Sequence, residues 1–291
     1  MLRATQWNGF IPSFPAALFA LSFIATIGGR ISAEGATDAG RESMKVVFLH
    51  HSTGGVIWRG GVAACFEKHN LDNGTDYRIE ERAFPKRFPY GWNNYPYDYW
   101  NIWVRNAGAA PYMEEPTLEM LTREYKVIVF KHCFPVSDVL PDTGRPDIAS
   151  DKKRLENYKL QYEALKKKLH EFPKTKFIVW TACPRVEVIS LKARLLALVR
   201  GKSPQRENAQ RSKAFVDWVR GEWDEPGDNI FLWDFHRLAT GGELFLKKEY
   251  AEGPGNSHPN GIFARDAAAV FCRRVISVIE GRGDHESLTG N

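Results

Sequence analysis

The chain has 291 residues, of which 43% are hydrophobic and 26% are charged, as is usual for a globular domain with a full apolar core. The formal charge of +5 is mild and no basic stretch is interleaved with aromatic residues, which argues against nucleic-acid binding. The four cysteines have no metal-ligand spacing. They leave open either one disulfide, as in exported proteins, or four buried thiols: Cys65, Cys133, Cys183 and Cys272.

The N-terminus has the pattern of an export signal. Arg3 precedes a mostly apolar stretch over residues 10–27, and the small residues Ser32 and Ala33 supply a cleavage site. An uncleaved anchor is the alternative, which Pro12 and Pro15 disfavour. We therefore expect residues 1–33 to be a signal peptide, 34–43 a linker and 44–291 a single domain. The protein is then expected to be secreted into the periplasm, to the cell surface or outside the cell.

Five short apolar runs alternate with amphipathic stretches through the rest of the chain. Three stretches have hydrophobic residues at helical spacing, over 151–171, 209–223 and 260–280. Strands that alternate with helices predict a parallel sheet covered on both faces, so the fold class is α/β, with three layers (α/β/α) and a five-stranded parallel sheet. The predicted strands are Val46–His50, Tyr77–Ala83, Val127–Lys131, Lys176–Thr181 and Asn229–Asp234.

Two residues expected at one edge of this sheet suggest catalysis. Ser52 directly follows the first strand, and His258 lies in the loop before the last helix. Ligands of open parallel sheets bind at the carboxyl ends of the strands. A serine hydroxyl becomes a good nucleophile when a nearby base such as imidazole takes its proton. Backbone N–H groups of Ser52 with Thr53 or Gly54 would then hold the oxyanion. Separately, Ser52 would fit a helix N-cap and His258 a loop histidine; together they predict a serine hydrolase.

These residues resemble the SGNH superfamily of hydrolases, also called GDSL-like, whose fold is flavodoxin-like. Its first block, Gly-Asp-Ser, corresponds here to His50-His51-Ser52. Its last block, Asp-x-x-His followed by Pro-Asn, corresponds to residues 255–260, with His258 in the place of the histidine. The resemblance covers residues 45–280. It implies an esterase with an acyl-serine intermediate, in which Ser52 is the nucleophile and His258 the base.

Gly255 stands where the family has the acid that orients its histidine. Asp234, at the end of the fifth strand, and Asn256 are the candidates for this role. A backbone carbonyl is a further alternative, which would leave a Ser–His dyad.

The family's oxyanion asparagine also has no counterpart after the third strand. Candidate donors, besides the backbone near Ser52, are Gly91, Asn93 and His132. The histidine is also readily explained as a packed residue at the end of a strand. The roles of His50 and His51 are left open.

An aromatic-rich insertion is expected at about residues 84–120. Trp92, Tyr95 and Trp100 either stack against sugar rings as substrate-binding residues or pack the insertion onto the sheet.

The sequence therefore predicts a serine esterase that deacylates a carbohydrate. Its partner would be a small-molecule or polysaccharide ester, and we expect no cofactor, metal, nucleic acid or integral membrane domain beyond the N-terminal segment. Two alternatives remain open. One is an O-acyltransferase acting on a sugar through the same intermediate, and the other is a non-catalytic glycan-binding protein on the same fold.

Overall fold

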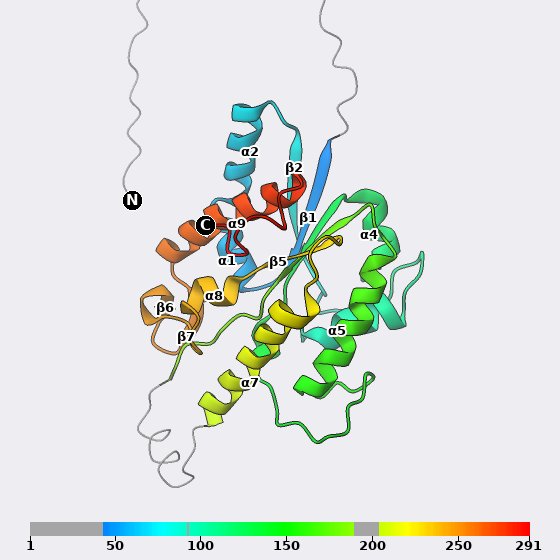
Figure 1. Cartoon of the computed structure of the whole chain (residues 1–291), viewed down its shortest axis with the longest axis vertical. Coiled ribbons are helices and arrows are strands. Elements are labelled where there is room, and N and C mark those ends of the chain that lie inside the picture. Colours follow the sequence, from blue (N-terminus) through cyan, green and yellow to red (C-terminus); the bar gives the residue numbers. More distant parts are fainter. Residues whose placement is uncertain (1–42, 92, 189–203) are drawn as a thin grey trace, which may run out of the picture. The chain divides into compact units, whose positions relative to one another are not determined.

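The computed structural model describes residues 43–91, 93–188 and 204–291 (Figure 1). The predicted signal peptide, the predicted linker apart from Ser43, and Trp92 lie outside the described residues. The described residues form one compact unit, in which five parallel strands are ordered β2-β1-β3-β4-β5. This confirms the predicted fold class. The strands are β1 (Met44–His50), β2 (Tyr77–Ala83), β3 (Val127–Phe130), β4 (Lys176–Trp180) and β5 (Ile230–Trp233).

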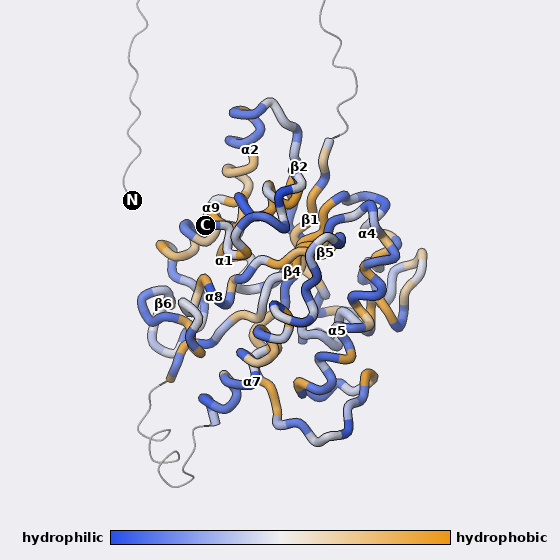
Figure 2. Tube along the Cα trace, viewed as in Figure 1, coloured by the Kyte–Doolittle hydropathy of each residue, from blue (hydrophilic) through white to orange (hydrophobic). Residues whose placement is uncertain are grey.

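Side chains of the sheet alternate between two apolar layers, as the pleat of a strand requires. On β1, Val46 and Phe48 pack on one face, whereas Val47 and Leu49 pack on the other. All four are fully buried, which explains the unbroken apolar run in the sequence. Figure 2 shows the same concentration of hydrophobic residues along the central strands. The exception is β2, an edge strand with four charged residues, none of whose residues is fully buried.

Helices cover both faces of the sheet. The layer that packs on Val46 and Phe48 contains α1 (Thr53–Arg59), α2 (Val62–Asn73), α8 (Phe235–Thr240) and α9 (Gly261–Ile279). The opposite layer contains α3 (Pro96–Trp100), α4 (Leu118–Glu124), α5 (Leu155–His170) and α7 (Pro204–Trp218). Short π-helical turns extend α3 and α7, namely η1 (Asn101–Arg105) and η3 (Val219–Trp223), and 3-10 turns form η2 (Phe134–Ser137) and η4 (Lys248–Tyr250).

The three predicted helices are confirmed as α5, as α7 continued by η3, and as α9. The Asn260 side chain caps α9 by accepting hydrogen bonds from the N–H groups of Ile262 (3.1 Å) and Phe263 (2.9 Å). The short helices α1, α3, α4 and α8, together with α2, are absent from the predicted elements. Most span too few residues to show a helical period.

The segment before α9 differs from the predicted loop. It forms a small antiparallel hairpin of β6 (Ala251–Gly253) and β7 (Asn256–Pro259). His258 therefore lies on a strand, because Gly255 at φ 76° allows the chain to turn back on itself after Pro254.

One disulfide joins Cys65 on α2 to Cys272 on α9, across 207 residues of sequence. Cys133 and Cys183 are free and buried.

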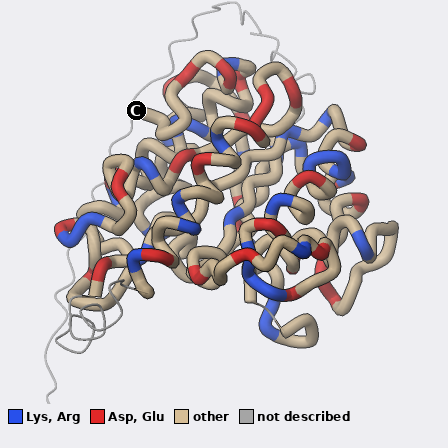
Figure 3. The backbone as a smooth tube through the Cα atoms, turned by 60° about the horizontal axis from the view of Figure 1, so that its bottom comes forward, with Lys and Arg blue, Asp and Glu red and all other residues tan. Residues whose placement is uncertain are grey.

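Between residues 43 and 291, wherever the chain is described, no helix is long and apolar enough to cross a membrane. The same residues contain no group of three or more side chains arranged to hold a metal ion. Positive and negative residues are interspersed along the described chain (Figure 3).

Candidate active site

Ser52 occupies a sharp turn between β1 and α1. Its φ of 51° and ψ of −109° place a non-glycine residue in a sparsely populated region of backbone conformation. The turn is held because the Gly54 N–H donates to the His51 carbonyl (3.0 Å) and the Val56 N–H donates to the Ser52 carbonyl (3.1 Å). Thr53 and Gly54 are buried, whereas Ser52 is exposed. The backbone thus presents the hydroxyl at the carboxyl end of β1.

The side chains of the two histidines that precede Ser52 pack around this turn. The buried His50 ring lies so close to Gly54 that a Cβ there would come within 2.5 Å of it. Nε2 of His50 is 2.9 Å from a Glu81 carboxylate oxygen on β2, and Nε2 of His51 donates to the Pro85 carbonyl at 2.6 Å. Burial, and then the charge of Lys131, lowers the pKa of His50 to about 3. The imidazole of His50 is therefore neutral near pH 7 and serves packing.

The structure brings Ser52 and His258 together. Oγ of Ser52 lies 2.5 Å from Nε2 of His258, although 206 residues separate them in sequence. On its other side, Nδ1 of His258 is 2.8 Å from Oδ1 of Asn256, which also accepts from the His258 backbone N–H at 3.1 Å. The Phe134 ring stands perpendicular to the imidazole at 5.2 Å. The candidate base is therefore held on three sides, and of the two candidate orienting residues it is Asn256 that contacts its Nδ1.

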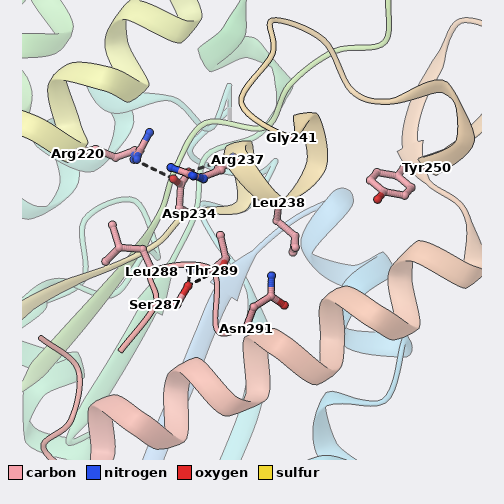
Figure 4. Close-up of a pocket in the computed structure, with 10 residues that line it drawn as sticks. All are labelled: Arg220, Asp234, Arg237, Leu238, Gly241, Tyr250, Ser287, Leu288, Thr289 and Asn291. Carbon is pink, nitrogen blue, oxygen red and sulfur yellow. Dashed lines mark hydrogen bonds and ion pairs between the residues drawn. The ribbon is translucent and has the colours of Figure 1, made fainter. Parts of the chain in front are cut away.

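Asp234 contacts other groups than His258, so its proposed orienting role is not seen. The carboxylate is fully buried, accepts from the Thr181 hydroxyl (3.0 Å) and the Arg237 N–H (3.1 Å), and lies 2.9 Å from Nε of Arg220. It caps α8 beside a cavity of about 650 Å³ (Figure 4). Its oxygens are used within this network at the end of β5.

Of the candidate oxyanion donors, three already have other partners. The Gly54 N–H donates to His51, and the Gly91 N–H donates to the Arg87 carbonyl at 2.8 Å. His132 is buried, with Nε2 2.6 Å from the Tyr162 hydroxyl and its ring 4.6 Å from that of Tyr99. Burial lowers the pKa of His132 to about 3, so it is a neutral core residue.

The remaining donors are the Ser52 and Thr53 N–H groups and the exposed Asn93. No intramolecular acceptor is recorded for the Ser52 and Thr53 N–H groups or for the Asn93 side chain within the described ranges, whereas the Asn93 backbone N–H bonds to Asp98. These groups remain the candidate donors.

The aromatic insertion packs mainly on the sheet. Tyr95 is 4% exposed and Trp100 7%, and the Tyr95 hydroxyl donates to the Asp151 carbonyl at 2.8 Å. Asp98 is buried beneath them, which raises the pKa of its carboxyl to about 6. Neither Tyr95 nor Trp100 offers an open face for a sugar, so packing explains them and the substrate-binding prediction is wrong for these two. Trp92 lies outside the described residues.

Three residues that sequence reasoning missed border the site. Phe134 packs on His258, and Lys131, fully buried at the end of β3, donates from Nζ to the His51 carbonyl at 3.2 Å. Glu252 accepts a hydrogen bond from Asn256. A lysine directly after a buried strand was a signal for Lys131. The other two contacts depend on the hairpin.

Comparisons with known proteins give distant structural likenesses. No protein-family model matches the chain, and no curated protein matches its sequence. The structure is similar to that of an acetyl xylan esterase, at 14% identity and a TM-score of 0.43, over 77% of this chain and 96% of the esterase. It is also similar to a gut microbial diltiazem-metabolizing enzyme, at 13% identity and a TM-score of 0.46, over 83% of this chain and 47% of that enzyme. The activity must therefore be inferred from the geometry of the site.

Proposed function

We propose that the protein is a serine esterase that works through an acyl-serine intermediate. The observation that carries this proposal is the 2.5 Å contact between Oγ of Ser52 and Nε2 of His258, at the carboxyl end of a parallel sheet. The contact to Asn256 gives the imidazole a fixed orientation, as the base of a hydrolase requires. The resemblance of residues 50–52 and 255–260 to the SGNH blocks supports the same class.

In this mechanism the Ser52 oxygen attacks the ester carbonyl while its proton passes to Nε2 of His258. The N–H groups of Ser52 and Thr53, with the Asn93 side chain, are the candidate donors to the oxyanion. His258 then returns the proton to the leaving alcohol. Water attacks the acyl group in the second half of the reaction and regenerates Ser52.

The buried Lys131 contributes a positive charge next to the turn that carries Ser52. Its ammonium group binds the carbonyl of His51, the residue directly before the nucleophile. A positive charge in a dry environment favours negative charge developing nearby. Lys131 therefore acts through the field at the turn rather than by proton transfer.

We propose an acylated carbohydrate outside the cytoplasm as the substrate. The predicted signal peptide and the Cys65–Cys272 disulfide support export, because disulfides persist mainly in oxidising compartments. The SGNH resemblance and the name of the acetyl xylan esterase suggest acetyl esters as the first substrates to test. The packed Tyr95 and Trp100 give no support to this choice.

The purified protein should hydrolyse an activated acetyl ester such as 4-nitrophenyl acetate. Ser52→Ala and His258→Ala should each lower kcat by roughly 10³-fold or more, because the nucleophile and its base act as one unit. Circular dichroism checks that both variants are folded.

Full activity in folded Ser52→Ala would contradict the proposal. Sugar binding without turnover in the unaltered protein would favour the glycan-binding alternative. Acyl transfer to an added sugar, faster than hydrolysis, would identify an O-acyltransferase with the same intermediate.

A further inference from the structure

A carboxylate lies behind Asn256 and extends the line of contacts that begins at Ser52. Nδ2 of Asn256 donates to Oε2 of Glu252 at 2.8 Å, while Oδ1 faces Nδ1 of His258, also at 2.8 Å. We propose that Glu252 is a positioning residue of the catalytic site, acting on His258 through the side-chain amide of Asn256. This inference rests on the proposed esterase function.

The contacts at the oxygen and at the NH₂ group of the Asn256 side chain both require the same orientation of its amide. A carboxylate only accepts hydrogen bonds, so Glu252 must face the NH₂ group. The His258 backbone N–H only donates, so it must face the oxygen. The oxygen therefore also meets Nδ1 of the imidazole, which must carry its proton there. The lone pair of Nε2 is left for the Ser52 proton, as a general base requires.

Without the carboxylate, one of these two constraints disappears. Only the His258 backbone N–H then opposes a turn of the amide, and the turned amide presents its NH₂ group to Nδ1, which favours the opposite imidazole tautomer. In that tautomer Nε2 carries a proton and cannot accept the one from Ser52. Glu252 thus selects the productive state of His258 without touching it.

The hairpin explains why the acid sits on β6. Asn256 and His258 are two residues apart on β7, so their side chains share one face of the strand. Glu252 comes from the paired strand, next to Gly253, which pairs with Asn256. Gly255, the position of the family's acid, has a φ of 76° that side-chain-bearing residues rarely adopt. The tight turn therefore requires a glycine at the position where the family has its acid. The carboxylate of Glu252 instead acts on His258 through the side-chain amide of Asn256.

Glu252 also bears on the charge that forms during the reaction. When Nε2 takes the Ser52 proton, the imidazole becomes a cation, and a hydrogen-bonded amide with an anion behind it stabilises that cation. Glu252 is exposed, so water screens much of its charge. Glu187 and Lys248, of opposite charge, line the cavity of about 450 Å³ that Gly253 and Gly255 border. We therefore expect a moderate effect.

The test compares Glu252→Gln with Glu249→Gln in the full chain. Glu249 is an exposed residue of the neighbouring turn whose side chain has no partner within the described ranges, so it controls for loss of a nearby charge. Glu252→Gln should lower kcat about tenfold with KM unchanged, because a neutral glutamine amide can face Asn256 with either its oxygen or its NH₂ group and so no longer requires one orientation of the Asn256 amide. The acid-side midpoint of its pH–kcat profile should move to lower pH, because the anion that favours protonated His258 is gone. Glu249→Gln should match the unaltered protein in both.

Asn256→Asp supplies a second measurement that a merely structural role would not explain. In the natural background it places two carboxylates in contact, whose repulsion should lower kcat. In the Glu252→Gln background the glutamine amide can donate to the new carboxylate, which accepts directly from Nδ1 of His258. There the same substitution should raise kcat.

The inference is overturned if folded Glu252→Gln and Glu249→Gln have the same kcat and pH profile while Ser52→Ala is inactive. It is overturned too if Asn256→Asp changes kcat in the same direction in both backgrounds. Activity that survives in Ser52→Ala is a separate outcome: it removes the proposed function, and with it this role of Glu252.

Discussion

The carboxyl ends of β1 and β5 both carry polar side chains, yet they differ in how those side chains are occupied. At β1, Ser52 is exposed and its hydroxyl has one partner among the described residues, the half-buried His258. At β5, Asp234 is fully buried and its carboxylate meets Thr181, Arg220 and the backbone of α8. Both positions satisfy the rule that sites form at strand ends. Only the first leaves a reactive atom open to a substrate.

The strained backbone of Ser52 and the buried carboxylate of Asp234 have different consequences. The strained backbone exposes the Ser52 hydroxyl, whereas the carboxylate of Asp234 contacts both α8 and η3 and so connects them. Changes at the first position should therefore affect turnover, and changes at the second should affect stability.

Asp234→Ala tests this division most strongly. It removes the cap of α8 and leaves Arg220 and Thr181 without their partner, so the free energy of unfolding should fall by about 3 kcal/mol. Urea denaturation followed by circular dichroism measures this loss. At a temperature where the variant is folded, its kcat should stay within about threefold of the unaltered value, because Asp234 does not contact His258. A stable variant that has lost activity would instead place Asp234 in the catalytic machinery.

A smaller effect is expected at the buried His132. The unfolded imidazole binds a proton below its ordinary pKa of 6.5, whereas the folded one binds it only near pH 3, so acid favours unfolding. Between pH 7 and pH 5 this one residue should cost about 2 kcal/mol of stability. His132→Gln, which retains a donor toward Tyr162, should lose less stability over that range by about the same amount.

His285→Gln is the matched control, since His285 is exposed. It should retain the natural pH dependence of stability. If the stability of His132→Gln and that of His285→Gln depend on pH in the same way, the conclusion that His132 is buried in its neutral form is wrong.

The sheet was predictable because its strands other than β2 are buried on both faces and show as continuous apolar runs, such as residues 127–130. The pairing of Ser52 with His258 followed from the rule on strand ends. The residue that contacts Nδ1 of His258 was harder to predict. The sequence offered Asp234 and Asn256 as alternatives, and the choice depends on a hairpin of two short strands whose turn at Gly255 cannot be recognised from periodicity.

The aromatic insertion shows the opposite limit. A string of tyrosines and tryptophans fits both stacking on a sugar and packing on a sheet, because both need large flat rings. Burial of Tyr95 and Trp100 distinguishes the two, and burial in a long connection is set by the path of the chain. The substrate therefore could not be predicted from these residues.

The most direct test of the account is covalent labelling of the nucleophile. An alkyl fluorophosphonate should add once to the protein, as measured by the mass of the intact chain. Peptide sequencing should locate the adduct on Ser52. Ser52→Ala should take up none, and His258→Ala should react far more slowly, since Oγ then lacks its base. An unlabelled protein, or an adduct on another residue while Ser52 stays unmodified, would contradict the assignment of Ser52 as the nucleophile.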